Sequence, residues 1–133
     1  MKAMSTKIIR SLNFGARINA ADNSGAKTLR IISVIGIKTR KGRIAAAGIG
    51  NLIQASVIEG KLGIRKQVVY AVIVRQKKEF KRKNGLSVGF EDNAAVVLKD
   101  DKGSPRGTIL KGPIAKEVGE RWPAITKLAS IVV

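Results

Sequence analysis

The chain of 133 residues contains no cysteine and no histidine. Without cysteine it can form neither a disulfide nor a thiolate metal site, which suits the cytosol. Without histidine it lacks the commonest general base, the usual partner of a serine nucleophile and the imidazole metal ligands. We therefore expect a protein that is not an enzyme, with no catalytic residues, no metal site and no cofactor.

Acidic residues are scarce as well, with 9 Asp and Glu against 26 Lys and Arg. Adjacent pairs occur at Glu91/Asp92 and Asp100/Asp101, but neighbouring strand residues point to opposite faces, so each pair is interpreted as turn or surface charge. The segment Gly25–Thr28 resembles a phosphate-binding loop only faintly, because it lacks the adjacent Gly-Lys and the upstream glycine. Neither pattern predicts an acid–base pair or a nucleotide site.

Long apolar runs are absent. No apolar stretch approaches the roughly 20 residues that a membrane-spanning helix needs. The basic residues within positions 1–7 are not followed by the apolar region of a signal peptide. No amphipathic helix with a Lys/Arg face favours a membrane surface. We expect neither a membrane partner nor a signal peptide.

The formal net charge is +17. A small domain usually carries a net charge of about 2–8, and a larger excess destabilises the compact chain by self-repulsion unless a polyanion neutralises it. The excess is uneven, because residues 1–90 hold 19 basic and 3 acidic side chains, whereas residues 91–133 hold 7 and 6. This asymmetry predicts nucleic acid as the partner of the first part and a different role for the second.

Runs rich in β-branched residues predict strands throughout most of the chain. They lie at Arg17–Ala21, Lys27–Ile35, Leu52–Glu59, Val68–Arg75 and Ala94–Leu98, with a weaker one at Thr108–Leu110. Short turns, not helices of 10–15 residues, separate them, which favours an antiparallel or barrel-like all-β domain over alternating βαβ units. The length suits one domain, residues 1–133, with a β-barrel over about 15–111.

The C-terminal segment, residues 112–133, differs from the rest. Gly112-Pro113 ends the β pattern, and Ile114, Val118 and Trp122 then share one helical face. Pro123 suits the first turn of a second helix. The pattern predicts two short helices whose apolar face covers one end of the barrel, although the same face could instead meet another protein.

Basic side chains cluster in three places. Six cations between positions 75 and 83 lead into Asn84-Gly85, a dipeptide favoured in type I′ hairpins, with Ser87–Phe90 as the return strand. We call this predicted hairpin, residues 75–90, the basic ribbon. A flexible basic loop surrounds Gly42, and a weaker one spans residues 61–66. The candidate RNA-binding residues are Lys38, Arg40, Lys41, Arg43, Arg65, Lys66, Arg75, Lys77, Lys78, Lys81, Arg82 and Lys83.

Such cations can grip phosphates on both sides of a nucleic-acid groove. The alternative is a solvated edge hairpin, in which lysines block aggregation, together with plainly solvated loops. Aromatic residues help to choose the type of nucleic acid. The five present are too few for a base-stacking platform, since Tyr70 falls in a core strand and Trp122 in the C-terminal segment. Backbone and shape recognition of a folded, duplex-rich RNA is therefore expected.

The stretch Ala71–Val97 resembles the signature of the universal large-subunit ribosomal protein L-fourteen family. Its elements are an apolar run at Ala71–Val74, Asn84-Gly85 after nine further residues, then Phe90, Asn93 and Val96-Val97. The turn Ala21–Ala26 and the tail Gly112–Ile114 are similar to the family too, and the resemblance covers Ile18 to Val133. Features such as Ala45–Gly48, Phe90–Asn93, Trp122-Pro123 and the Val-Val ending resemble archaeal or eukaryotic members more than bacterial ones, and the lack of a long eukaryotic-type N-terminal extension favours an archaeal member.

The resemblance implies a small five-stranded β-barrel with a protruding basic hairpin and a short C-terminal two-helix segment. It implies a structural role in the large ribosomal subunit, in the cytoplasm, with binding to large-subunit (23S) rRNA. It also implies bridges to small-subunit rRNA across the intersubunit face. The partners it implies are ribosomal proteins L-three and eL-twenty-four, with initiation factor six as a further candidate beside the C-terminal region. A free-standing basic nucleic-acid-binding module or RNA chaperone is the alternative.

Overall fold

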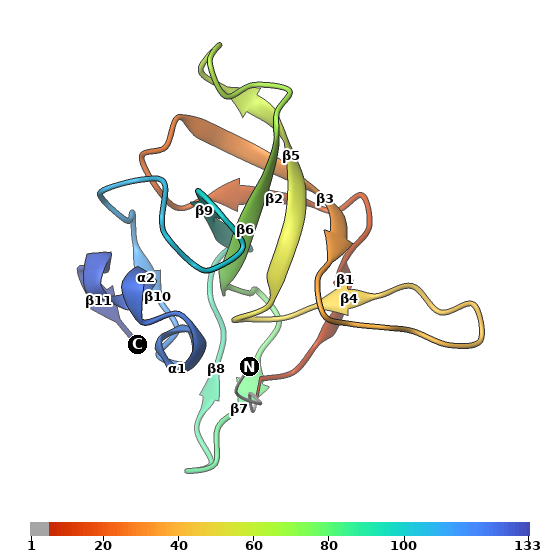
Figure 1. Cartoon of the computed structure of the whole chain (residues 1–133). Helices are drawn as coiled ribbons and strands as arrows, with labels where there is room; N and C mark the ends of the chain where they lie inside the picture. Colours follow the sequence, from red (N-terminus) through yellow and green to blue (C-terminus); the bar gives the residue numbers. More distant parts are fainter. Residues whose placement is uncertain (1–5) are drawn as a thin grey trace.

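Five strands of the computed structural model close into a barrel, in the order β2-β3-β5-β6-β9 (Figure 1). They are β2 (Arg17–Ala20), β3 (Ala26–Val34), β5 (Leu52–Gly60), β6 (Val68–Arg75) and β9 (Ala94–Leu98). Neighbours pair antiparallel except β2 and β9, whose parallel pairing closes the barrel. The barrel is confirmed, and the five predicted strands agree with the observed ones to within one residue at each end.

The structure describes residues 6–133, so the first part of the basic N-terminal stretch, positions 1–5, lies outside it. Short elements surround the barrel: β1 (Ile9–Asn13), β4 (Ala46–Ala47), β7 (Phe80–Lys81), β8 (Ser87–Val88), β10 (Pro113–Ile114), α1 (Val118–Arg121), α2 (Pro123–Leu128) and β11 (Ile131–Val132). The pairs are β1 with β4, β7 with β8, and β10 with β11. The strand predicted at Thr108–Leu110 is wrong, because of these residues only Leu110 forms a bridge, to Asp22.

Strands β6 and β9 separate two cores. Side chains such as Ala71 and Val97 point into the barrel, where they join the first buried cluster. Their neighbours Val72 and Val96 point outward and join the second cluster, which we call the second core. Because both faces of these strands are covered, their sequences are continuous apolar runs without the usual alternation.

The C-terminal segment forms the other half of the second core. Its helices are shorter than the apolar spacing indicated, because Ile114 lies in β10 and Trp122 lies between α1 and α2. Ile114, Val118 and Trp122 are nonetheless all buried in the second core. They therefore cover the outer side of β6 and β9. The sequence analysis had placed them over one end of the barrel instead. No helix within residues 6–133 has the length and apolar character needed to cross a bilayer.

Candidate nucleic-acid interface

The basic ribbon projects from the barrel at the bottom of Figure 1. β7 and β8 pair antiparallel, with Phe80 opposite Val88. At the tip, the backbone N–H of Gly85 donates to the carbonyl of Arg82 (3.0 Å), and the N–H of Arg82 donates to the carbonyl of Leu86 (2.8 Å). Gly85 has a φ of 88°, whereas Asn84 is not left-handed. The tip is thus a type I turn followed by a left-handed glycine, and the type I′ prediction is wrong.

Four ribbon lysines are free to bind a ligand. Their side chains are exposed and have no hydrogen-bond or ion-pair partner among the described residues. They are Lys77, Lys78, Lys81 and Lys83. Four ammonium groups and a single carboxylate, Glu79, on a narrow projection make a concentrated positive surface.

Arg75 is the first ribbon candidate that the structure uses elsewhere. It is 8% exposed, and its Nε and Nη2 donate to the two carboxylate oxygens of Asp92 at 2.9 and 3.3 Å. Its Nη1 donates to the carbonyls of Lys111 (2.7 Å) and Pro113 (3.1 Å). The guanidinium therefore joins β6 to the start of the C-terminal segment. It has little capacity left for a phosphate, so we remove Arg75 from the candidate interface.

Arg82 is the second. Its Nε and Nη2 donate to the two carboxylate oxygens of Glu117 at 2.7 and 3.1 Å, and Nη2 also donates to the main-chain oxygen of Val133 at 2.6 Å. The side chains of Arg82 and Glu117 are 11% and 4% exposed. Strand alternation explains this, since Phe80 and Arg82 face the protein while Lys81 faces solvent. Arg82 connects the ribbon to the C-terminal segment, and we remove it from the candidate interface as well.

The loop between β3 and β4 projects from another side of the barrel, to the right in Figure 1. Its four cations, Lys38, Arg40, Lys41 and Arg43, are all exposed. The chain reverses at Lys41 and Gly42, which both have left-handed backbones (φ 58° and 69°). The backbone N–H of Arg43 donates to the carbonyl of Arg40 across this turn (3.3 Å), so the turn presents all four cations to solvent.

A third basic projection, residues 61–67, joins β5 to β6 at the top of Figure 1. Ile64 is buried and anchors it, whereas Arg65 and Lys66 are exposed. Lys66 has a left-handed backbone (φ 65°), and its N–H donates to the carbonyl of Val57 at 2.9 Å. The loop is therefore fixed at its base while its cations face solvent.

Sequence reasoning missed some exposed cations. Arg10 and Arg17 lie on β1 and β2 with their side chains exposed, and they were assigned no role. The alternation around buried Ile18 was the available signal for Arg17. Lys111 was missed because it stands alone in the sequence, and only the fold brings it near other lysines.

The aromatic side chains offer no stacking platform in the described part of the chain. Phe80 and Trp122 are buried, Tyr70 and Phe90 are half-buried, and Phe14 alone is largely exposed. No group of three or more carboxylates within residues 6–133 is arranged to hold a metal ion. The exposed functional groups are chiefly ammonium and guanidinium groups, which recognise phosphate.

Asp22, in the turn after β2, is a buried carboxyl with a structural role. Its Oδ2 accepts a hydrogen bond from the backbone N–H of Val97 (3.0 Å) and its Oδ1 accepts one from the Ser24 hydroxyl (2.8 Å). Burial raises the pKa of Asp22 above its usual range, more than these hydrogen bonds lower it. A folded-state pKa above the unfolded one means that the group contributes stability at low pH, and that this contribution is lost as the pH rises through the folded value.

Asp22→Asn should therefore stabilise the protein more, relative to the wild type, at neutral pH than near pH 4. The amide oxygen can still accept from Val97, and the side chain stays neutral at both pH values. Urea denaturation of both proteins at the two pH values measures the difference in unfolding free energy. A difference that shrinks as the pH rises would show that nearby lysines stabilise the carboxylate, contrary to the burial argument.

Comparison with known proteins identifies the family. Residues 11–133 match the family model described as ribosomal protein L14p/L23e. A protein of Nanoarchaeum equitans named large ribosomal subunit protein uL14 is 53% identical over 133 residues, covering all of both chains. Proteins of the same name from Methanococcus maripaludis and Methanococcus vannielii are 48% and 47% identical over 132 residues, 99% of each chain. These relatives are archaeal, as the sequence features indicated, and the chain belongs to the ribosomal protein L14p/L23e family.

Proposed function

We propose that this protein is a structural constituent of the large ribosomal subunit that binds 23S rRNA through backbone phosphates and shape. It works in the cytoplasm within the subunit, helps to form bridges to small-subunit rRNA, and performs no catalysis. Family membership and full-length relatives named as large-subunit proteins support this role. The structural observation that carries it is the set of four exposed, unpartnered lysines on a ribbon that projects clear of the barrel.

Ten of the twelve candidate residues make up the proposed interface. They are Lys38, Arg40, Lys41, Arg43, Arg65, Lys66, Lys77, Lys78, Lys81 and Lys83. The three projections that carry them extend in different directions from the barrel (Figure 1). The arrangement suits a folded RNA that surrounds the protein and is recognised by its phosphates.

The near-neutral part of the chain, residues 91–133, is the proposed site for protein neighbours. Residues 91–133 carry little net charge, and the chain end at β11 exposes Ile131, Val132 and Val133 by 54%, 46% and 46%. Ribosomal proteins L-three and eL-twenty-four, and initiation factor six, are the proposed partners of this region. The buried residues Ile114, Val118 and Trp122 are not available to them.

Replacing Lys78, Lys81 and Lys83 with alanine tests the rRNA role. The slope of log affinity against log salt should become shallower by about 0.7–0.9 for every phosphate that the variant no longer binds. The folded stability should change little, because these side chains have no partner among the described residues. Affinity for 23S rRNA, measured at several salt concentrations, gives the slope.

The matched control replaces Lys99, Lys102 and Lys127 with alanine, which removes the same amount of charge from other surface positions. If both triple variants have the same slope, the ribbon is a solvated edge whose lysines only oppose aggregation.

Sedimentation of a cell lysate at moderate salt distinguishes the ribosomal role from the alternative function. Protein that stays away from the large subunit would instead be a free-standing nucleic-acid-binding module or chaperone.

A further inference from the structure

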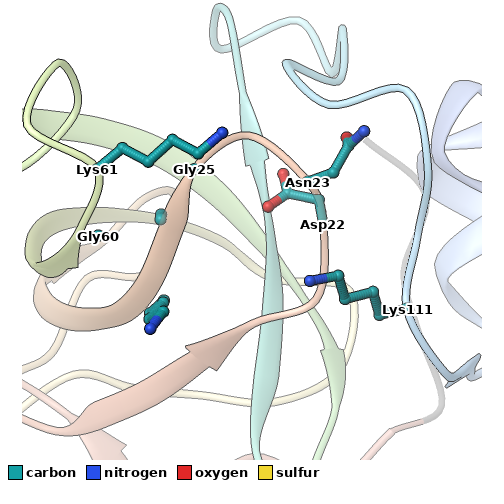
Figure 2. A pocket seen from close by; sticks show the side chains of 8 residues that line it. Asp22, Asn23, Gly25, Gly60, Lys61 and Lys111 are labelled. Carbon is teal, nitrogen blue, oxygen red and sulfur yellow. The ribbon is translucent and has the colours of Figure 1, made fainter.

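A pocket of about 380 Å³ lies beside the turn between β2 and β3, away from the basic ribbon (Figures 1 and 2). Its lining includes Lys27, Lys61 and Lys111, which come from β3, the loop after β5 and the segment before β10. Figure 2 shows the side chains of Lys61 and Lys111 extending toward the Asp22–Gly25 turn from opposite sides. Lysines 34 and 50 positions apart in the sequence thus meet in the lining of one hollow.

Two glycines let the backbone segments beside the hollow approach each other closely. A Cβ atom on Gly60 would lie 2.6 Å from the carbonyl oxygen of Gly25, so a side chain there cannot be accommodated without moving the backbone. Gly25 itself has a φ of 101°, and a Cβ on it would meet the Lys61 stem at 3.3 Å. The stem of Lys61 therefore packs over Gly25, and the backbone N–H of Lys61 donates to the Gly25 carbonyl at 3.0 Å.

The backbone of Lys111 is fixed as firmly. Its N–H donates to the carbonyl of Ala21, and its carbonyl accepts from Arg75. The Oδ1 of Asn23 accepts from the backbone N–H groups of Thr108 and Ile109 at 2.8 and 3.2 Å, which holds the chain just before Lys111 against the turn. Backbone hydrogen bonds therefore hold Lys61 and Lys111 in place beside the hollow.

The pocket carries an excess of positive charge. None of the three ammonium groups has a hydrogen-bond or ion-pair partner among residues 6–133. The one carboxyl in the lining, Asp22, is 2% exposed and accepts its hydrogen bonds from Val97 and Ser24. Three like charges around one hollow repel one another unless an anion joins them.

We propose that Lys27, Lys61 and Lys111 together bind one backbone phosphate of the rRNA, at a site separate from the ribbon and from the loop between β3 and β4 and located at the base of the projection formed by residues 61–67. This inference rests on the proposed rRNA-binding function and adds an anchoring point beside the turn between β2 and β3. A phosphate suits the hollow because its oxygens can accept from several ammonium groups at once. Lysine contacts to a phosphate fix the position of the protein on the RNA without reading a base.

The test is the salt dependence of 23S rRNA binding by the full chain carrying Lys27→Gln, Lys61→Gln and Lys111→Gln. Because three lysines share one phosphate, the log–log slope should fall by only about 0.7–0.9, the value for a single contact. Three independent surface contacts would lower it about three times as much and overturn the shared site. An unchanged slope, equal to that of a Lys99/Lys102/Lys127→Gln control, would also overturn it.

A second measurement needs no variant. An amine-reactive reagent and mass spectrometry report the accessibility of each lysine in the free protein and in its rRNA complex. Labelling of Lys27, Lys61 and Lys111 should drop together on adding rRNA, while that of Lys99 stays unchanged. Equal protection by ATP or inorganic phosphate alone would instead assign the pocket to a free anion and overturn the RNA assignment.

The ribbon variant distinguishes failure of the pocket proposal from failure of the proposed rRNA-binding function. If the ribbon variant has a reduced salt slope and the pocket variant has the wild-type slope, the pocket proposal is wrong and the proposed function is still supported. If the wild type itself shows no salt-dependent affinity for 23S rRNA, the rRNA-binding function fails, and the pocket proposal fails with it.

Discussion

Arg82→Ala is expected to lower the free energy of unfolding by about 3–5 kcal/mol, the usual cost of leaving one member of a buried ion pair alone. Glu117 is 4% exposed at its side chain and is deprived of both hydrogen bonds from the guanidinium. The main-chain oxygen of Val133 is deprived of a donor as well. Urea denaturation followed by circular dichroism measures the destabilisation.

Lys83→Ala is the matched control, because it removes a neighbouring cation that is exposed to solvent. Its unfolding free energy should stay within about 0.5 kcal/mol of the wild type. Replacing both Arg82 and Glu117 with apolar residues of similar size should recover much of the stability, since no uncompensated charge then stays buried. Wild-type stability for Arg82→Ala, with a reduced salt slope for rRNA, would make Arg82 an RNA contact after all.

The difference between Arg82 and its neighbours has a practical consequence for the rRNA experiments. An Arg82 variant would lower rRNA affinity by loosening the attachment of the ribbon to the C-terminal segment, with or without a contact between its guanidinium and a phosphate. Such a variant cannot distinguish a binding ribbon from a solvated one. Lys78, Lys81 and Lys83 can, because their side chains have no partner within residues 6–133.

The sequence predicted the barrel well for a local reason. Strands such as Val68–Arg75 and Ala94–Leu98 are short, rich in β-branched residues and bounded by turn formers. The local sequence is therefore enough to predict where they begin and end. The sequence analysis missed β1 because only Ile9 and Leu12 of its five residues are buried, and because its partner β4 is two residues long. The pairing that makes β1 a strand comes from a segment more than 30 residues away.

The candidate interface was predictable only in part, because a charge count does not show where a side chain points. Arg75 and Arg82 stand in the same cationic run as the four free lysines. Their carboxylate partners, Asp92 and Glu117, lie 17 and 35 residues further along the chain. Conversely, Lys27, Lys61 and Lys111 are far apart in the sequence, and the close approach of β3 and β5 at Gly25 and Gly60 helps to bring them together.

Trp122→Ala is expected to cost about 3–5 kcal/mol of unfolding free energy, as for other large-to-small changes in a core. Trp122 is 5% exposed in the second core, and its Nε1–H donates to the Gly50 carbonyl at 2.9 Å. Gly103, with a φ of 102°, packs so closely on the ring that a Cβ there would lie 2.6 Å from a ring carbon. Thermal denaturation followed by circular dichroism measures the effect, since the variant lacks the chain's one tryptophan as a fluorescent probe.

Trp122→Phe separates packing from hydrogen bonding. It keeps an aromatic ring in the second core but leaves the Gly50 carbonyl without its donor, so it should cost about 1–3 kcal/mol. A Trp122→Ala protein that keeps the wild-type unfolding midpoint while its C-terminal segment alone becomes protease-sensitive would show that the segment folds separately. The barrel and the segment are one folding unit if the whole protein shifts together.

The same segment holds Glu117, immediately before α1, so Trp122 and Arg82 act on one element. Once Trp122→Ala has loosened the C-terminal segment, the ion pair between Arg82 and Glu117 is already weakened, and removing Arg82 costs less stability. The double variant should therefore be destabilised by less than the sum of the two single variants. Strict additivity would mean that the ribbon is attached to the C-terminal segment independently of the second core.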